Sequence, residues 1–418
     1  MPKLRFPEFV GYSLQDLQLG DSTAESTERN GSGQAPSQIM GVSKVEGIVP
    51  MEERIVAADT ARYKVVRKDW FAYNPMRLNI GSIARWQGEN DILVSPDYVV
   101  FMCKSTGPHR LDPSYLDHFR RSDAWENYVS EKGDGSVRVR IYYKDLARLQ
   151  LALPSCLEQQ KIATCLDSAE ELIAAQGRKV VALKAYKKGM MQQLFPQEGE
   201  TQPRLRFPEF EAAGKWAEVP LSKLVSALDA GVSVNSGDRP AMSYEIGVLK
   251  TSAVTNGVFE PLENKVVFDE EEIKRVREPV RADTVILSRM NTPALVGANA
   301  YVKDGYPNIF LPDRLWAAKP RPGADMRFVA LVLGSDMGRA ALSGLAGGSS
   351  GSMKNISKPS VLELVVMAPS LPEQQRIADC LTSFDELIAA ETRKLNAVKT
   401  HKKGLMQQLF PFIEESAS

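Results

Sequence analysis

The chain has 418 residues, which is enough for two or more domains that each bury a core of their own. Hydrophobic residues make up 43% and charged residues 25%, as in an ordinary soluble globular protein, and Lys+Arg equals Asp+Glu at 52 each. This balance excludes a uniformly basic binding surface, because a protein that binds nucleic acid alone usually has a basic excess. Either nucleic acid is not the partner, or positive charge is local and partners supply the rest.

No segment predicts export or a membrane span. The first residues, MPKLRFPEFVGYSLQDL, lack the apolar core and cleavage site of a secretory signal. The most apolar run, 328–342, is interrupted by Asp336 and Arg339 and cannot span a bilayer. Four cysteines are few for this length and indicate a reducing compartment. We therefore expect a protein of the cytoplasm with no membrane partner.

The first domain is predicted over residues 1–157. It opens with PKLRFPEF, and its polar stretch at 20–38 is expected to be a loop without a core. Short β-branched runs at 99–102 and 137–143 are expected to be strands, and proline-containing breaks separate such runs. The pattern is typical of a mixed α/β fold.

A long helix is predicted next, over 158–196, followed by a linker at 197–202. Neither segment is predicted to be an independent domain, but the sequence of the helix occurs a second time in the chain. The stretch EQQKIATCLDSAEELIAAQGRKVVALKAYKKGMMQQLFP matches residues 373–411 at 26 of 39 positions, with an offset of 373 − 158 = 215. Such a long internal repeat indicates a duplicated structural unit.

The second domain is predicted over 203–372, opening with PRLRFPEF, a second copy of the first opening. Its β-branched runs and prolines again predict a mixed α/β fold. Both domains end alike, with LALPS at 151–155 and VVMAPS at 365–370, so we expect one fold with two different surfaces. The second repeated helix, 373–411, and a short tail, 412–418, complete the chain.

Both repeated helices carry an apolar seam whose spacing alternates between four and three residues, as in a coiled coil. Each seam spans 33 residues, or roughly 50 Å at ~1.5 Å per residue. The seam residues are Ile162, Leu166, Ala169, Ile173, Val180, Leu183, Met190 and Leu194 in the first copy, and Ile377, Leu381, Phe384, Ile388, Leu395, Val398, Leu405 and Leu409 in the second. Gln176, Lys187, Glu391 and Lys402 fill the gaps.

An apolar seam of this size has to be buried, because each large side chain contributes about 1.5–3 kcal/mol when it leaves water. We predict that the two helices pair with each other in antiparallel fashion. The fold class is therefore α+β: two mixed α/β domains separated by a long antiparallel two-helix coiled coil, with pseudo-two-fold symmetry. An oligomerising coiled coil, paired between chains, is the alternative.

The sequence contains no constellation that predicts catalysis. The glycine-rich stretch GLAGGSSGSMKN at 344–355 is not followed by Gly-Lys-Ser/Thr, so it is not a phosphate loop. The segment FAYNPMRLN at 71–79 lacks the second proline and the aromatic residue of an Asn-Pro-Pro-aromatic methyltransferase motif. With only three histidines and no suitable Cys/His spacing, no metal site is predicted.

Two modules, each followed by LPxxxEQQxIA…KKGxMQQLFP, resemble the specificity subunit of type I restriction-modification systems. The LRFPEF openings, YNPMRLNIGSIA at 73–84 and FLPDRLW at 310–316 add to the resemblance, which covers essentially the whole chain. It implies that each module is a target-recognition domain for one half of a bipartite double-stranded DNA sequence. The paired helices would then set the gap, about one DNA turn, and dock two methyltransferase subunits.

The resemblance also implies where the chemistry lies. The chain would be a non-catalytic subunit of a prokaryotic complex and would hold no cofactor itself. S-adenosylmethionine, ATP and magnesium are expected in the methyltransferase subunits and in the restriction or translocase subunits that join through them. Partners that share the neutralisation of phosphates would account for the zero net charge.

Candidate base-reading side chains follow from chemistry, since arginine suits guanine and asparagine suits adenine. The candidates are Lys44, Arg77, Arg85, Arg138 and Arg140 in the first module, and Lys250, Asn256, Arg289, Asn291, Lys354 and Asn355 in the second. Each could instead be an ordinary solvated side chain, and Asn74 and Asn79 are expected to stabilise turns. A coiled-coil scaffold without DNA readout is the alternative function, and a fused nuclease or methyltransferase is a third hypothesis that the missing motifs disfavour.

Overall fold

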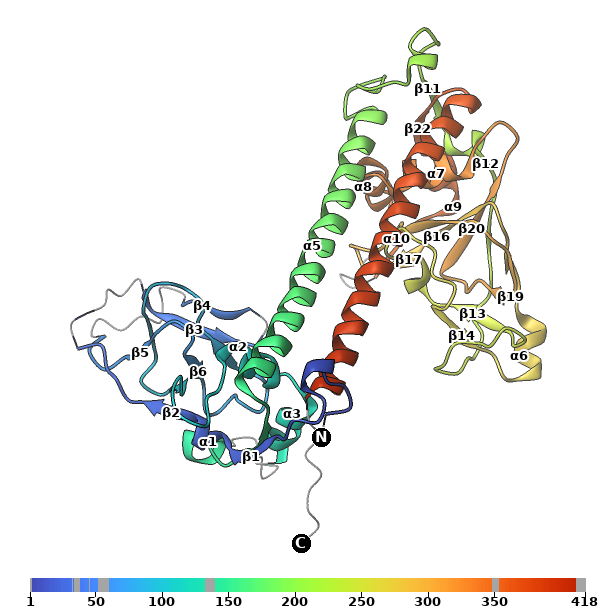
Figure 1. Ribbon diagram of the computed structural model, residues 1–418. Coiled ribbons are helices and arrows are strands. Elements are labelled where there is room, and N and C mark those ends of the chain that lie inside the picture. Colours follow the sequence, from blue (N-terminus) through green and yellow to red (C-terminus); the bar gives the residue numbers. More distant parts are fainter. Residues whose placement is uncertain are drawn as a thin grey trace. The chain divides into compact units, whose positions relative to one another are not determined.

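The computed structural model describes residues 2–31, 33, 38–44, 46–51, 60–131, 140–347 and 353–410 (Figure 1). The chain divides into two compact units. Unit 1 comprises the chain up to Arg178 together with the part from Arg393 onward, and unit 2 comprises Lys179–Thr392. Each unit therefore contains one module and a part of both long helices.

Unit 1 is built around a four-stranded antiparallel sheet with the order β2-β9-β6-β7. Three two-stranded antiparallel ladders, β1-β10, β3-β4 and β5-β8, surround it. The strands are β1 (Gln15–Gln18), β2 (Thr23–Ser26), β3 (Met40–Ser43), β4 (Gly47–Pro50), β5 (Lys64–Val66), β6 (Phe71–Tyr73), β7 (Ile83–Arg85), β8 (Ile92–Val94), β9 (Val99–Cys103) and β10 (Gln150–Leu153).

Helices pack on this sheet and complete the core of unit 1. Apolar side chains of the sheet, such as Phe71 and Phe101, are buried together with Phe119 and Trp125 of the helices. The helices are α1 (Leu19–Ser22), α2 (Pro113–Phe119), α3 (Asp123–Glu131), α4 (Tyr143–Leu146) and the first part of α5 (Cys156–Leu194).

Two local predictions for the first module are wrong. The sequence predicts a loop at 20–38, but Thr23–Ser26 is strand β2, whose small polar side chains Thr23 and Ser26 are buried. The Thr23 hydroxyl donates to the Leu19 carbonyl (2.8 Å), so burial is compatible with its polarity. The strand expected at 137–143 is also wrong where it is described, because 140–142 have no regular structure and Tyr143 begins α4.

Unit 2 contains two four-stranded sheets, β12-β20-β16-β18 and β14-β13-β19-β15, and the ladders β11-β22 and β17-β21. The strands are β11 (Ala217–Pro220), β12 (Val225–Ala230), β13 (Gly247–Leu249), β14 (Asn264–Val266), β15 (Pro279–Val280), β16 (Thr284–Ser288), β17 (Met290–Asn291), β18 (Asn299–Val302), β19 (Tyr306–Phe310), β20 (Leu315–Pro320), β21 (Lys354–Asn355) and β22 (Val365–Ala368). The helices are α6 (Glu270–Arg275), α7 (Met326–Gly334), α8 (Asp336–Gly344), α9 (Lys358–Glu363) and α10 (Leu371–Leu409), of which Leu371–Thr392 lie in this unit.

The two modules share a topology. The order β2-β9-β6-β7 corresponds to β12-β20-β16-β18, and β1-β10 corresponds to β11-β22. In both modules two short helices follow, along the chain, the strand that is second in the sheet order. Helices α2 and α3 follow β9, and helices α7 and α8 follow β20. The sheet β14-β13-β19-β15 corresponds to the ladders β3-β4 and β5-β8 of the first module, which a parallel bridge between Ile39 and Leu93 joins in the same order. This agrees with the prediction of one fold with divergent surfaces.

Both long helices have 39 residues and begin two residues before the predicted start. Ser155 and Ser370 lie just before them, and their carbonyls accept hydrogen bonds from Gln159 N (2.9 Å) and Gln374 N (3.0 Å). The Ser155 hydroxyl also accepts from Glu158 N (3.3 Å). Serine followed three residues later by glutamate is an N-terminal capping signal that marks the true start of both helices. Both helices end directly before Phe-Pro, at Leu194 and Leu409, two residues before the predicted ends at 196 and 411.

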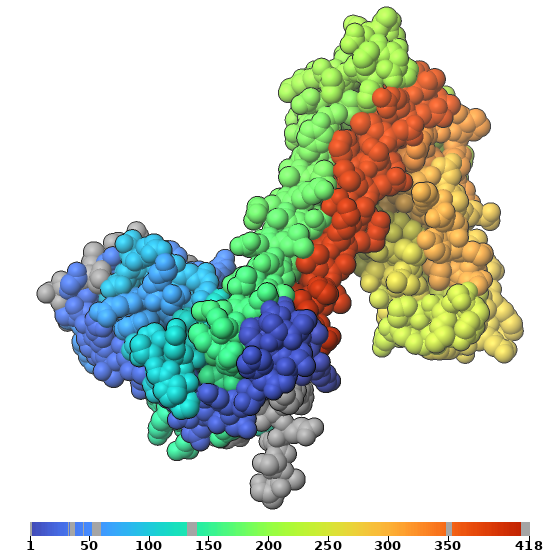
Figure 2. Space-filling model, viewed as in Figure 1, coloured from blue at the N-terminus to red at the C-terminus, as the bar shows by residue number. Residues whose placement is uncertain are grey.

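Inside each unit the two helices pack against each other. In unit 2, Lys187 Nζ lies 2.5 Å from Asp385 Oδ1 and Lys179 Nζ lies 3.1 Å from Glu391 Oε1, so the two segments run antiparallel. The Tyr186 and Phe384 rings are 5.3 Å apart, and Figure 2 shows the green and red segments in contact here. In unit 1, Glu170 accepts a hydrogen bond from Lys402. All predicted seam residues are buried or half-buried.

The contact of Lys187 with Asp385 and that of Lys402 with Glu170 are equivalent in the repeat. Lys187 corresponds to Lys402, and Asp385 corresponds to Glu170. Each places a seam lysine against an acidic residue of the other helix. Three of the four polar gaps in the seam, Lys187, Glu391 and Lys402, are therefore filled by paired charges, whose burial is less costly than that of unpaired ones.

The LRFPEF openings close over the first turn of the helix in their own half. Arg5 makes a bidentate pair with Glu158 (2.8 and 2.5 Å), and Arg206 makes the same pair with Glu373 (2.7 and 2.7 Å). These carboxylates are 1% exposed. Figure 2 shows the dark-blue opening lying against the adjoining helix ends in unit 1. The two repeated motifs recur together because they bind each other.

The QQLFP ends of the helices complete the same junctions. Leu4 N donates to the Gln408 carbonyl (3.0 Å), and Leu205 N donates to the Gln193 carbonyl (2.9 Å). Phe410 packs between Tyr115 and Phe119 in unit 1, with ring centroids 5.3 and 5.6 Å apart. In unit 2 Phe195 packs on Trp216 and Phe328 in the same way. The end of α10 thus belongs to the core of the first module, and the end of α5 to the core of the second.

Candidate nucleic-acid interface

The loop at 74–82 joins β6 to β7 and presents several side chains to solvent. Asn74 shapes it, since its Oδ1 accepts from Met76 N (3.0 Å) and its carbonyl accepts from Arg77 N (2.9 Å). The loop ends near Gly81, whose φ of 89° favours glycine. Asn74 is thus a turn-stabilising residue, as expected. Met76, Arg77, Asn79 and Ile80 are exposed.

Two further predicted candidates approach this loop from other parts of the sequence. The Lys44 side chain lies over Gly81, and the Ser82 hydroxyl donates to the Val42 carbonyl (3.0 Å). On the other side, Ile141 N donates to the Pro75 carbonyl (3.0 Å), which places Arg140 beside the loop. Lys44, Arg77 and Arg140 are exposed, and none forms an ion pair with a described carboxylate. The fold thus gathers three cations around one loop.

Arg85 differs from these three because its side chain is only 11% exposed. Its Nη1 lies 3.6 Å from Asp69 Oδ1 and its Nε lies 4.0 Å from Asp117 Oδ2. The Nε is buried without a hydrogen-bond partner in the described part of the chain. Arg85 therefore lies behind the loop rather than on its exposed face. Arg138, the fifth candidate of the first module, lies outside the described residues.

A matching loop at 291–297 lies between β17 and β18 in the second module. Asn291 Oδ1 accepts from Thr292 N (2.9 Å), and Gly297 has a φ of 76°. The loop has the same place in the sheet order as loop 74–82, and it too begins with asparagine and ends at a glycine with positive φ. Between these two positions the exposed residues differ, with Met76, Arg77, Asn79 and Ile80 in the first loop and Thr292, Pro293 and Ala294 in the second.

Four predicted candidates of the second module meet at this loop. In the β17-β21 ladder, Asn291 pairs with Lys354 and Met290 pairs with Asn355. Ile356 N donates to the Arg289 carbonyl (2.9 Å). The Arg289 guanidinium lies 5.6 Å from the centre of the Trp316 ring, and its Nε is buried. Asn355 is exposed and Lys354 is half-buried.

Lys250 and Asn256 lie elsewhere, beside the second sheet of the module. Lys250 follows β13, and its Nζ lies 3.5 Å from Glu263 Oε2. Asn256 is exposed in the turn after residues 251–254. The fold does not bring these two candidates to loop 291–297 through any ladder or hydrogen bond among the described residues.

Neither loop contains groups suited to metal chemistry. No group of three or more His, Cys, Asp or Glu side chains is arranged to hold a metal ion in the described ranges. The four cysteines are free thiols. Among the helices described, none is both long and apolar enough to cross a bilayer.

Comparison with known proteins gives the family. Residues 215–400 match the family model described as the type I restriction modification DNA specificity domain. A putative type I restriction enzyme MjaX specificity subunit from Methanocaldococcus jannaschii is 23% identical over 372 residues, which are 85% of this chain and 81% of the relative. The chain belongs to the specificity subunits of type I restriction-modification systems.

Solved structures agree with the fold of this specificity subunit. The type I restriction-modification S subunit from M. genitalium aligns with a TM-score of 0.58 at 13% identity, over 99% of this chain and 100% of that one. A chain from a study of complex assembly and conformational transition in a type I restriction-modification system aligns with a TM-score of 0.54 at 16% identity, over 96% and 98%. At these identities the likeness concerns the fold alone.

Several charged side chains near the first loop of this specificity subunit are not among the candidates predicted from the sequence. Asp69 and Asp117 flank Arg85, and Arg120 and Arg121 flank Asp117. The contact between Arg85 and Asp117 joins residues 117 − 85 = 32 apart, so no local pattern could reveal it. Arg120 and Arg121, by contrast, lie within one helical turn of Asp117, at a spacing that is visible in the sequence. A partial signal existed for Glu170, because a carboxylate also occurs at the equivalent position of the other helix, Asp385.

Proposed function

We propose that each module of this specificity subunit reads one half of a bipartite double-stranded DNA target, and that α5 and α10 fix the gap between the halves. The observation that carries the proposal is the pair of matching loops, 74–82 and 291–297. They have the same place in the same sheet topology, but they present different side chains. A constant frame with variable loops suits the recognition of two different sequences.

The chemistry of the two loops suits different contacts. In the first, Lys44, Arg77 and Arg140 offer positive charge for phosphates and a guanidinium for a guanine edge. In the second, Asn291 and Asn355 offer amide groups, which suit adenine, beside Lys354. Cations concentrated at the first loop allow DNA binding without a basic excess in the whole chain.

Contacts inside each unit support a helix pair within one chain. Antiparallel contacts in unit 2 and the equivalent charged pair in unit 1 both join α5 to α10. A continuous antiparallel coiled coil with pseudo-two-fold symmetry extends these contacts along the whole seam. Such a frame suits two identical partner subunits, one for each DNA strand.

The partners supply the chemistry in this proposal. Two methyltransferase subunits dock on the helix pair and bring S-adenosylmethionine, and restriction or translocase subunits join through them with ATP and magnesium. The similarity in fold to a chain studied for complex assembly in a type I system supports an assembled role. The complex is expected in the prokaryotic cytoplasm, where its DNA is.

The test is co-expression with the partner methyltransferase, followed by mapping of methylated bases in the host DNA. We expect a split, asymmetric motif with a fixed unspecified gap. A continuous motif, or methylation without sequence preference, would contradict the proposal. The purified chain alone, given DNA, magnesium, S-adenosylmethionine and ATP, should form no product, and any product would support an enzymatic function.

Loop variants separate this function from that of a scaffold without DNA readout. Arg77→Ala removes an exposed guanidinium at the first loop and should weaken methylation of the first half-site sequence. Arg148→Ala is the control, because Arg148 is exposed in the same module but lies just before β10, away from the loop. If the protein were only a scaffold, Arg77→Ala and Arg148→Ala would give the same methylation pattern.

A further inference from the structure

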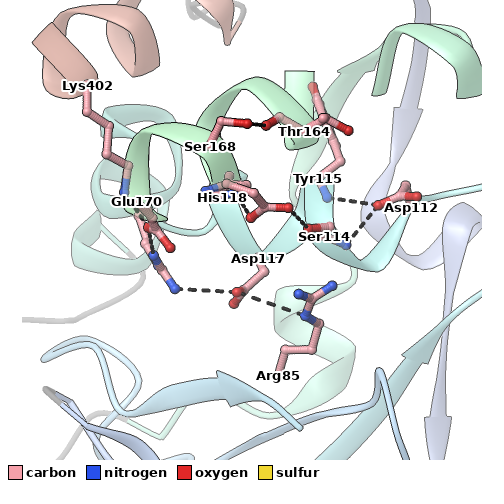
Figure 3. A network of polar contacts seen from close by, with 12 residues as sticks. Arg85, Asp112, Ser114, Tyr115, Asp117, His118, Thr164, Ser168, Glu170 and Lys402 are labelled. Atoms are coloured by element: carbon pink, nitrogen blue, oxygen red, sulfur yellow. Dashed lines mark hydrogen bonds and ion pairs between the residues drawn. The ribbon is translucent and has the colours of Figure 1, made fainter. Parts of the chain in front are cut away.

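One polar network connects the first module with both long helices in unit 1 (Figure 3). At its centre is Asp117 of α2, whose side chain is 10% exposed. Its Oδ1 accepts from Arg120 Nε (2.7 Å), and its Oδ2 accepts from Arg121 Nη2 (3.3 Å). Arg85 Nε lies 4.0 Å from the same Oδ2. Three guanidinium groups therefore surround one buried carboxylate.

The network continues from α2 to α5 and α10. Arg121 Nη1 donates to Glu170 Oε1 (2.5 Å), and Glu170 also accepts from Lys402. Burial alone would raise the pKa of Glu170, but the hydrogen bond from Lys402 and the charge of Arg121 outweigh it and lower that pKa. Glu170 is therefore ionised at neutral pH and links α2 to both long helices.

A second set of contacts fastens α2 to α5 without involving Arg85. His118 Nε2 lies 2.7 Å from Asp167 Oδ1, and the Ser114 hydroxyl donates to Asp167 Oδ2 (3.0 Å). The two sets of contacts connect different elements, because Asp167 joins only α2 to α5. Asp117 also reaches β7, the strand that directly follows loop 74–82.

Arg85 is held in an unusual way at the other end of the network. Asp69, the second carboxylate near it, has a φ of 66°, a conformation that side-chain-bearing residues rarely adopt. The distances from Arg85 to Asp69 and Asp117, 3.6 and 4.0 Å, are too long for hydrogen bonds. The position of its guanidinium therefore depends on the charges of these carboxylates more than on fixed bonds.

A cleft of about 820 Å³ opens between loop 74–82 and the helices α2, α3 and α5, and Arg85, Asp117 and Glu170 are among its lining residues. It is poorly suited to a phosphate. Arg85, Arg120 and Arg121 are balanced by Asp69, Asp117 and Glu170, so an anion beside them would meet carboxylates that are already paired with these three cations. The network is better suited to holding parts of the protein in place.

We propose that Asp117 is a positioning residue for DNA reading by the first module. Its charge holds Arg85, and with it the β7 end of loop 74–82, in a fixed place relative to α5 and α10. Because the proposed gap is set by these helices, this contact keeps the first half-site reader in register with them. The inference rests on the proposed function and adds a determinant of specificity to it.

The second module lacks this arrangement in the described residues. Its corresponding helix, α7, is fastened to α10 by Arg327, which bridges Asp325 (2.7 Å) and Asp379 (2.6 Å). No ion pair continues from this group to β18 in the part that the structure describes. Loss of the Asp117 charge should therefore affect the first half-site alone.

The experiment uses Asp117→Asn in the full specificity subunit, co-expressed with its methyltransferase partner. Asparagine keeps the size and one acceptor but removes the charge. We measure methylation of a cognate site and of sites with one mismatch in either half. We expect discrimination in the first half to fall about tenfold, comparable to the contribution of one base pair. Discrimination in the second half and the affinity for unrelated DNA should not change.

Asp167→Asn is the matched control, because it loosens α2 from α5 without facing Arg85. It should lower the melting temperature and leave both half-sites equally well discriminated. Asp117→Glu, which restores the charge, should recover part of the first-half discrimination. If Asp117→Asn yields no folded complex, Arg121→Gln interrupts the same path at a side chain that is 37% exposed, and it should act in the same direction.

The outcomes are distinguishable. If Asp117→Asn behaves like Asp167→Asn, with lower stability and unchanged discrimination, Asp117 is only structural and the inference is overturned. Equal losses in both halves overturn it as well. A wild-type complex without a split motif would instead refute the proposed function itself.

Discussion

Arg5 and Arg206 each hold a junction together through a carboxylate that is almost completely buried. The hydrogen bonds to Glu158 raise the pKa of Arg5, so this guanidinium stays charged under all ordinary conditions. Lys161 and Arg376 reinforce the two junctions, since each lies over the aromatic ring of the adjacent opening, Phe6 or Phe207. These residues stabilise the frame that joins each opening segment to its long helix.

Glu158→Gln should therefore destabilise unit 1 strongly. The change leaves a largely buried guanidinium without its charged partner, which costs roughly 3–5 kcal/mol in comparable buried pairs. Denaturant unfolding followed by hydrogen exchange should show the loss in unit 1. Glu200→Gln is the control, because its partner Arg204 is 66% exposed and little change is expected. Equal effects of the two changes would show that the junction is not a stabilising contact.

His118 predicts a pH dependence of the same unit. Burial lowers its pKa below the usual value of 6.5, although the hydrogen bond to Asp167 and the charge of Glu170 act in the opposite direction. The folded state therefore binds this proton less readily than the unfolded state does. The stability of unit 1 should be full above pH 6.5 and should fall as the pH drops from 6.5 through the lowered folded pKa.

Melting temperatures between about pH 7.5 and pH 5 would measure this effect. His118→Gln keeps a hydrogen-bond donor for Asp167 but cannot titrate, so its melting temperature should depend less on pH than that of the wild type. Parallel curves for the two proteins would contradict the assignment to His118.

At the scale of elements, the long helices are the part of the molecule with the most regular design. Each seam begins in one module core, with Ile162 and Leu166 or Ile377 and Leu381, and its last residue lies in the other. The middle of each seam carries charged residues that pair between the helices. Each long helix therefore contributes side chains to both module cores.

Insertion of one heptad after Arg178 and one after Arg393, which are equivalent positions of the repeat, should widen the gap in the DNA target. Seven residues keep the seam in register and add about 10 Å, or roughly three base pairs of DNA. Methylation mapping would measure the new gap. Insertions of five residues at the same points would turn the seam away from its partner and should abolish methylation. An unchanged gap after the heptad insertion would show that the helices do not set it.

At the scale of the whole molecule, the frame is duplicated, whereas the exposed residues of loops 74–82 and 291–297 are not. Each module core is closed by an opening segment, the start of one long helix and the end of the other. Because these contacts recur in both halves, a module can vary on its loops without disturbing its attachment. This separation explains why 26 of 39 helix positions match while the modules have diverged.

Replacement of residues 10–157 by the corresponding module of another specificity subunit should change one half of the methylated motif. The other half and the gap should stay as they were, since loop 291–297 and both helices are retained. Sequencing of methylated host DNA is the measurement. A change in both halves would show that the modules do not read independently.

The sequence alone determined the two long helices, their seams, the two modules and the family resemblance. These features depend on periodicity, helix-breaking prolines and repetition, all of which are local or are directly visible as a repeat. Even here the repeat predicts helix starts two residues late, because the Ser-x-x-Glu capping signals at 155–158 and 370–373 begin ahead of it.

Only the tertiary structure decided which distant residues meet. Arg5 pairs with Glu158, Phe410 enters the core of the first module, and Lys44, Arg77 and Arg140 surround one loop. The strand expected at 137–143 and the loop expected at 20–38 failed for the same reason. A β-branched run becomes a strand, and a polar segment such as Thr23–Ser26 becomes buried, only according to the neighbours that the fold supplies.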